Sequence, residues 1–305
     1  MKGRVIRSTG LWYNVLGEDQ KIYTCRARGK FRLDDIKESN PIAVGDRVVF
    51  DHDQKEGHIT ELIPRENLIE RKSVKKTGHS HVLAANVDQV MLIATLKQPR
   101  TSLGFIDRFL VSAESFRIPQ ILIFNKKDIL SKEELQHQEE LMYLYSSLNV
   151  KVLAISATED ASIEEVKTLL NGKTTLIAGH SGVGKSTLLN RISDTIQQTV
   201  SEISGFSEKG THTTTFAEMF QINQSTFLID TPGVKEWGLM DMNEQEISDY
   251  FPEMRERRLN CKFGSRCIHL TEPGCAVLKA LESGEIALCR YQSYVSMVSG
   301  QDNRK

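Results

Sequence analysis

Apolar positions change their pattern along the chain. In residues 1–70, short apolar segments are separated by the turn-forming residues Gly, Asp and Asn, so we expect five short strands. Five such strands in a segment of this length predict a small β-barrel of the OB type, and an SH3-like barrel would give a similar pattern. The strands are expected near 3–7, 12–16, 21–27, 46–50 and 58–63.

From residue 88 onward, long apolar runs alternate with amphipathic segments. Near-continuous apolar strands bounded by helices predict an α/β domain with a mostly parallel sheet that helices cover on both faces. We expect strands near 89–95, 120–124, 151–155, 174–178, 216–222 and 225–229, and helices near 102–116, 132–148, 162–170 and 185–193.

The domain organisation follows from these patterns. We expect an OB-fold domain at 1–70, a basic linker at 71–84, an α/β domain at 85–240 and a mainly helical domain at 241–305. The 39 Lys and Arg residues nearly cancel the 40 Asp and Glu residues, so overall charge indicates no class of partner. The start of the chain carries no pattern of a secretory signal, and no apolar run approaches the roughly 18–20 residues that span a bilayer. A cytoplasmic protein without membrane contact is expected.

A phosphate-binding loop is the clearest chemical motif. Gly179 begins a G-x-x-x-x-G-K-S pattern between a predicted strand and a predicted helix, as this motif requires. Lys185 would reach the β- and γ-phosphates and assist catalysis, and the Ser186 hydroxyl would bind Mg²⁺. We expect this whole loop to bind the nucleotide: Gly179, His180, Ser181, Gly182, Val183, Gly184, Lys185, Ser186 and Thr187.

Four weaker motifs follow other predicted strands or precede one, and each alone is also typical of an ordinary turn. Together they favour a guanine nucleotide, because ligands of open α/β sheets bind at the carboxyl ends of strands. The Asp128 carboxylate would accept hydrogen bonds from N1–H and the 2-amino group of guanine, and backbone N–H groups at Ser156 and Ala157 would meet O6. The motifs are Asn125-Lys126-Lys127-Asp128, Ser156-Ala157, Gly210-Thr-His-Thr-Thr-Thr215 and Asp230-Thr-Pro-Gly233, with Ser186, Thr214 and Asp230 expected around Mg²⁺.

The order of these motifs is unusual. The guanine-reading motifs precede the phosphate loop, and Gly210–Thr215 and Asp230–Gly233 follow it. An ordinary GTPase begins with the phosphate loop and ends with the guanine-reading motifs, so this order predicts a circular permutation. Surface breaks of this kind are tolerated because a sheet depends on its spatial neighbours.

Cysteine residues gather in the last fifth of the chain. Three thiols and one imidazole are the ligands of a tetrahedral zinc site, and four protein ligands would make such a site structural. In a reducing compartment this clustering favours a metal over disulfides, although buried free thiols stay an alternative. The four residues are Cys261, Cys267, His269 and Cys275.

Basic residues alternate with uncharged ones in one segment of the barrel. At period two, Arg26, Arg28, Lys30 and Arg32 would share one face of an extended segment. Contact with RNA and an ordinary solvated strand face are both open interpretations. Further cations at Arg255, Arg257, Arg258, Lys262 and Arg266 surround the cysteine cluster and favour RNA contact there.

Taken together, these motifs resemble the ribosome small-subunit-dependent GTPase A family, with Arg28-Gly-Lys-Phe-Arg32 and Glu272-Pro-Gly-Cys as further shared elements. The family usually has Arg where this chain has Thr211. The resemblance implies a circularly permuted P-loop GTPase domain flanked by an N-terminal OB-type β-barrel and a C-terminal zinc-binding domain. It also implies GTP hydrolysis with Mg²⁺, slow alone and stimulated by the small (30S) ribosomal subunit during late maturation, with contacts to its 16S rRNA. A monomer that alternates between GTP and GDP is expected.

The position after Gly233 changes the expected mechanism. Ras-like enzymes keep a water-orienting Gln there, whereas this chain has Val234, whose apolar side chain cannot orient water. Our hypothesis is that His212 orients the attacking water, beside Lys185 and Thr214. The main alternative is a nucleotide-regulated RNA-binding factor in which hydrolysis is incidental. An ATP-dependent kinase is disfavoured by Asn125–Asp128.

Overall fold

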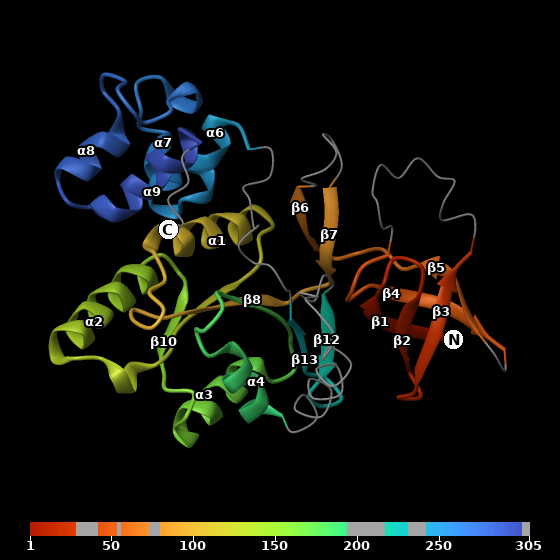
Figure 1. Cartoon of the computed structure of the whole chain (residues 1–305). Coiled ribbons are helices and arrows are strands. Elements are labelled where there is room, and N and C mark those ends of the chain that lie inside the picture. Colours follow the sequence, from red (N-terminus) through yellow and green to blue (C-terminus); the bar gives the residue numbers. More distant parts are fainter. Residues whose placement is uncertain (29–41, 54–55, 73–79, 194–216, 231–241, 301–305) are drawn as a thin grey trace. The chain divides into compact units, whose positions relative to one another are not determined.

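The structure is a computed structural model (Figure 1). It describes residues 1–28, 42–53, 56–72, 80–193, 217–230 and 242–300, and for residues 71–72 and 80–81 it describes the backbone alone. The chain forms two compact units, and each is built from two stretches of sequence. The first unit contains Met1–Met91 and Ala157–Glu236, and the second contains Leu92–Ser156 and Trp237–Lys305.

The first unit begins with a closed five-stranded barrel. Strand β1 (Lys2–Ser8) pairs with both β2 (Tyr13–Gly17) and β4 (Arg47–His52), and β3 (Ile22–Ala27) runs parallel to β5 (Gly57–Leu62). The barrel therefore closes in the order β1-β2-β3-β5-β4, the OB arrangement expected from the sequence. Alternate strand residues point inward and form its core, together with one residue before β4: Val5, Tyr13, Val15, Cys25, Ile42, Val48, Phe50 and Ile59.

The same unit holds the strands that border the phosphate loop. Strand β11 (Thr174–Gly179) is parallel to β13 (Phe227–Asp230), and β12 (Glu218–Gln221) is antiparallel to β13. Strand β12 also pairs with β1 of the barrel, where Glu218 lies opposite Arg7. Helix α3 (Asp160–Leu170) precedes β11 and helix α4 (Lys185–Ile192) follows it.

A two-stranded hairpin lies partly within the segment predicted as a linker. Strands β6 (Leu68–Lys72) and β7 (Ser80–Ala85) pair antiparallel. The sequence did not predict them, because the intervening residues are polar and basic. Backbones approach closely beside this hairpin: Gly45 has φ +92°, and a Cβ there would lie 2.0 Å from the carbonyl oxygen of Ala85. Only glycine fits this position.

The second unit combines part of the α/β domain with the C-terminal helices. Strand β8 (Gln89–Ala94) leads into it, and its strands follow the order β10-β9-β8. Strand β9 (Gln120–Phe124) is parallel to β10 (Lys151–Ala154). Helices α1 (Leu103–Ser115) and α2 (Lys132–Ser146) follow β8 and β9. The strands and helices expected between residues 89 and 193 are therefore all present.

Four helices, α6 to α9, gather near α1 in this unit (Figure 1). They are α6 (Glu244–Ile247), α7 (Pro252–Arg258), α8 (Ala276–Glu282) and α9 (Leu288–Val298). Their core includes apolar residues from the helices, Val111 of α1 and three cysteines. None of the helices in the described ranges combines the length and apolar character that a membrane span needs.

Candidate nucleotide and metal sites

The phosphate loop connects β11 to α4. Gly182 and Gly184 have φ values of +83° and +94°, a conformation that favours glycine. Val183 between them is fully buried and anchors the loop, whereas Ser186 and Thr187 at the start of α4 are exposed. The loop is therefore anchored inside the protein at Val183 and accessible to solvent at Ser186 and Thr187. The positive end of the α4 helix dipole lies at this loop.

Two predicted phosphate- and magnesium-binding side chains lie together at this loop. The Lys185 ammonium lies 2.5 Å from the Asp230 carboxylate at the end of β13. The parallel pairing of β11 with β13 brings their carboxyl ends to the same edge of the sheet. Both side chains keep part of their surface exposed, at 19% for Lys185 and 33% for Asp230. The predicted phosphate-binding cation, Lys185, and the predicted magnesium-binding carboxylate, Asp230, therefore lie next to each other at a solvent-accessible position.

The residues of the second unit that are predicted to read guanine lie at the carboxyl ends of β9 and β10. Asn125 is 2% exposed, and its backbone N–H donates to the Ala94 carbonyl at 2.9 Å. The Lys127 N–H donates to the Ile155 carbonyl at 3.1 Å, which ties this loop to the segment that contains buried Ser156. Lys126 has φ +65°, and Asp128 presents its carboxylate to solvent.

One residue that the sequence analysis missed holds the segment after Ser156. Arg191 of α4 donates through Nη1 to the carbonyl of Thr158 at 2.9 Å and, at 3.5 Å, to that of Ala157. Its other terminal nitrogen pairs with the Asp160 carboxylate. Ala157 itself is buried. No sequence pattern links Arg191 to this segment, because the partners are more than thirty residues apart.

Several predicted site residues lie outside the described residues. These are His212, Thr214 and Gly233 of the GTPase motifs, and Lys30 and Arg32 of the barrel. Their roles stay predictions.

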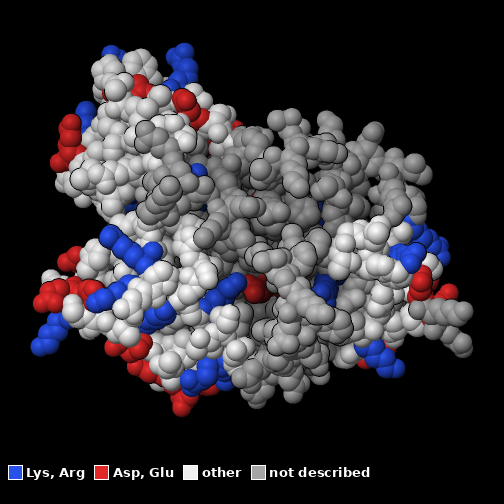
Figure 2. Space-filling view, viewed as in Figure 1, with Lys and Arg blue, Asp and Glu red and all other residues white. Residues whose placement is uncertain are grey.

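The two described cations of the barrel segment are exposed but paired. The Arg26 guanidinium lies 3.8 Å from the ring centroid of Trp12 and 3.7 Å from the Glu56 carboxylate, and Arg28 pairs with Asp51 at 3.3 Å. Both signs of charge are visible on the barrel in Figure 2. These contacts fit a solvated strand face as well as an RNA-binding one, so both interpretations stay open.

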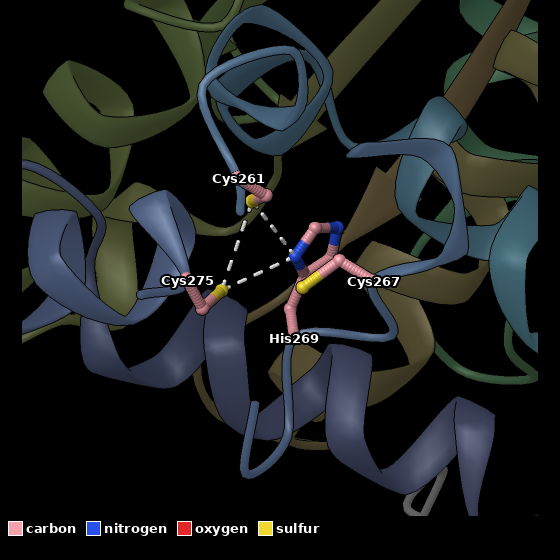
Figure 3. A group of neighbouring side chains, drawn as sticks. All are labelled: Cys261, Cys267, His269 and Cys275. Atoms are coloured by element: carbon pink, nitrogen blue, oxygen red, sulfur yellow. Dashed lines mark hydrogen bonds between the residues drawn. The ribbon is translucent and has the colours of Figure 1, made fainter. Parts of the chain in front are cut away.

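The predicted zinc ligands come together in the second unit (Figure 3). The three sulfurs and one ring nitrogen all lie within 4.8 Å of one another, and all four residues are buried. His269 Nδ1 is 3.7 Å from Cys261 Sγ and 3.3 Å from Cys275 Sγ, and the two sulfurs are 3.9 Å apart. In a tetrahedral zinc site the ligand atoms are separated by about 3.5–3.8 Å. The separations among Cys261, His269 and Cys275 are close to these values, and Cys267 lies within the same 4.8 Å, so the four residues could hold a metal ion of this size.

The surroundings of the cluster also suit a cation. Burial raises the pKa of the Cys267 thiol to about 12, raises that of Cys275 and lowers that of His269. Burial alone therefore favours neutral ligands, and a bound divalent cation would supply the charge that deprotonates the thiols. The Ala276 N–H donates to Cys261 Sγ at 3.3 Å and the Leu278 N–H to Cys275 Sγ at 3.4 Å, contacts that favour thiolates.

The loop that carries His269 is held from two sides. The Glu272 carboxylate accepts hydrogen bonds from the backbone N–H groups of residues 268, 270 and 271. From α9, the Tyr291 hydroxyl donates to the His269 carbonyl at 2.8 Å and the Tyr294 hydroxyl to the Ile268 carbonyl at 2.6 Å. The cluster is thus positioned by hydrogen bonds as well as by packing.

A buried ion network joins this helical module to α1. Arg290 of α9 is 2% exposed and contacts Asp107 of α1 at 2.6 Å and Glu253 of α7 at 2.8 Å. Asp107 also accepts a hydrogen bond from the Tyr145 hydroxyl at 2.9 Å. Burial lowers the pKa of Arg290, but the two carboxylates outweigh that effect and raise it. The network fixes α7 and α9 to the helices that follow β8 and β9.

Two models of known protein families match this chain. The family model described as the RsgA GTPase matches residues 62–240, and the RsgA N-terminal domain matches residues 2–59. The chain belongs to the RsgA GTPase family. The expected family is confirmed, and the chain is a GTP hydrolase of this family.

Relatives of this family match the chain over its full length. The chain is 48% identical over 307 residues to the small ribosomal subunit biogenesis GTPase RsgA of Christiangramia forsetii, covering 99% of this chain and 97% of the relative. It is 44% identical over 306 residues to the protein of that name in Bacteroides fragilis, with 100% and 98% covered.

Two solved structures match the fold of this chain. The crystal structure of YjeQ from Thermotoga maritima has a TM-score of 0.78 at 35% identity and covers 100% of this chain and 99% of that one. The structure of YloQ, a circularly permuted GTPase, has a TM-score of 0.75 at 32% identity, with 100% and 96% covered. The circular permutation predicted from motif order is therefore confirmed, as is the predicted fold class.

Proposed function

We propose that this protein hydrolyses GTP to GDP and phosphate during late maturation of the small (30S) ribosomal subunit, as a monomer in the cytoplasm. Hydrolysis is slow alone and stimulated by that subunit. The observation that carries the proposal is the complete set of permuted GTPase motifs in a chain whose full-length relatives are named small ribosomal subunit biogenesis GTPases.

The proposed nucleotide-binding residues keep their predicted roles. Asn125, Lys126, Lys127, Asp128, Ser156 and Ala157 bind guanine, and residues 179–187 bind the phosphates together with Asp230 and Gly233. Mg²⁺ is bound through Ser186, Thr214 and Asp230. The contact between Lys185 and Asp230 supports this assignment because it gathers both charges at the loop. His212 orients the attacking water, since Val234 cannot.

The flanking modules are proposed to bind 16S rRNA. The barrel, in the domain 1–70, would use Arg26, Arg28, Lys30 and Arg32, and the linker 71–84 would connect it to the GTPase domain 85–240. In the domain 241–305, Cys261, Cys267, His269 and Cys275 would hold one structural zinc ion, and the spacing of their ligand atoms supports that choice.

GTP turnover in the presence of purified 30S or 50S subunits tests the proposal. We expect the small subunit to stimulate turnover and the large subunit to leave it unchanged. The His212→Ala variant should lose the stimulation and keep GDP affinity, and Lys167→Met serves as a surface control. Equal turnover with and without 30S subunits would contradict the proposal. Binding to 30S that depends on GTP without stimulated turnover would favour the RNA-binding factor that Val234 makes plausible.

A further inference from the structure

Helix α4 carries functional groups at both of its ends. It begins at Lys185 of the phosphate loop, and its last turn contains Arg191. Leu188, Leu189 and Ile192 are buried and fix the helix against the core of the first unit. The direction of the Arg191 side chain is therefore set by the same rigid element that positions the phosphate loop.

Arg191 donates hydrogen bonds to backbone carbonyls as well as pairing with a side chain. Its Nη1 contacts the Thr158 carbonyl at 2.9 Å and the Ala157 carbonyl at 3.5 Å, and its Nη2 pairs with the Asp160 carboxylate. The Asp160 side chain is 95% exposed, so the ion pair contributes little by itself. Hydrogen bonds from a guanidinium to backbone carbonyls are charge-assisted and directional. The backbone contacts are thus the stronger part of the arrangement.

We propose that Arg191 is a positioning residue for guanine recognition: by holding the carbonyls of Ala157 and Thr158 it fixes the backbone that follows Ala157, and so orients the adjoining Ala157 N–H toward guanine O6. The inference rests on the proposed function, in which Ala157 reads O6. An Arg is suited to this role because its planar fork reaches two carbonyls and a carboxylate at once, which a Lys cannot do. The helix would then orient the phosphates with its first residues and the base-reading backbone with its last turn.

Nucleotide discrimination tests this role more directly than activity does. The dissociation constants of GDP and of 2-aminopurine riboside diphosphate, which lacks O6 and with it the N1–H, are measured by calorimetry for the full-length protein, and each variant is compared with wild type for the same nucleotide. In Arg191→Met we expect GDP affinity to fall by about tenfold, as for loss of a charge-assisted hydrogen bond, with the analogue affinity within about twofold of wild type. The GDP affinity of Arg191→Lys should lie between those of wild type and Arg191→Met, because a Lys ammonium keeps the charge but lacks the planar fork.

Two control variants separate the backbone contacts from charge. Asp160→Asn removes the ion pair and keeps the carbonyl contacts, so its GDP preference should stay within about twofold of wild type. Lys167→Met removes the cation of an exposed pair with Glu164 on α3, and it should leave both affinities unchanged. Parallel loss of both nucleotides in Arg191→Met, no loss of either, or an equal effect of Asp160→Asn would overturn the inference.

The failure of this inference can be told apart from the failure of the proposed function. If the guanine site lies at Asn125–Asp128, the Asp128→Asn variant should prefer xanthosine triphosphate to GTP. If that exchange occurs while Arg191→Met retains full discrimination, only the role of Arg191 is wrong. If Asp128→Asn has no effect, the guanine site itself is wrong.

Discussion

The metal cluster and the phosphate loop are built in opposite ways. The predicted metal ligands lie between Cys261 and Cys275, are buried, and three of them belong to the hydrophobic core of the helical module. Lys185 and Asp230 come from separate elements, remain partly exposed and lie at the end of a sheet that is packed without them. From this comparison we expect a metal at the cluster to contribute to the folding of its module, whereas the phosphate loop lies on a fold that other residues stabilise.

Removal of a metal ligand should therefore have the largest effect. In Cys275→Ser, or after chelation, we expect the helical module to unfold, because structural zinc sites contribute on the order of 10 kcal/mol to small domains. Metal content by mass spectrometry and helix content by circular dichroism check this outcome. Cys289→Ser, a half-buried thiol outside the cluster, is the matched control and should retain both. A Cys275→Ser protein with wild-type helix content would show that packing alone holds the module.

Loss of Arg290 should have the next largest effect. Arg290→Met leaves Asp107 and Glu253 buried without a cation, which costs about 3–5 kcal/mol of unfolding free energy. Urea unfolding measures it. Adding Asp107→Leu and Glu253→Met to Arg290→Met should restore much of the loss, because an apolar cluster needs no counter-charge. If the triple variant were no more stable than the single one, the loss would not come from the unpaired carboxylates.

Replacement of Lys185 should affect chemistry and leave the fold unchanged. We expect Lys185→Ala to lower GTP turnover at least about 100-fold, because a preorganised charge at the phosphates is removed. Its unfolding free energy should change by less than about 1 kcal/mol, since the side chain is partly exposed. Steady-state turnover and urea unfolding give the two values. A large fall in stability would place this loop in the same class as the metal cluster.

The smallest effect is expected for the exposed barrel cation Arg26. Arg26→Met removes a surface ion pair with Glu56 and a contact with Trp12, so it should change the unfolding free energy by less than about 1 kcal/mol. If the barrel binds 16S rRNA through this face, the logarithmic salt dependence of binding should decrease by about one. An unchanged salt dependence would favour the solvated strand face.

Local chemistry could be predicted from the sequence. Asn125–Asp128, Gly179–Thr187 and the cysteine cluster each carry their functional groups within a short stretch, and strand ends bring such stretches to one edge of a sheet. The barrel and the α/β domain could be predicted because apolar periodicity is likewise a property of short stretches of sequence. The strands predicted within residues 1–70 and the strands and helices predicted within residues 89–193 are present in the structure.

The contacts that hold these motifs in place could not be predicted. Arg191 and Arg290 are ordinary surface-type residues in the sequence, and their partners are 31 to 183 residues away. The Tyr294 hydroxyl donates to the backbone carbonyl of Ile268, in the loop that carries His269. Every residue has such a carbonyl, so the identity of the partner residue does not reveal the contact. The β6–β7 hairpin was not predicted, because a polar and basic stretch separates the apolar residues of its two strands. Long-range pairing, rather than local propensity, decides these features.

The long separation within the Arg290 network has a consequence for synthesis on the ribosome. Asp107 is made 183 residues before Arg290, so α1 must pass through most of translation without its cationic partner. During that interval its apolar face, including Val111, lacks the C-terminal helices that cover it in the finished protein. The apolar face of this helix would then stay uncovered on the nascent chain, and the second unit would be completed only when α9 has left the exit tunnel.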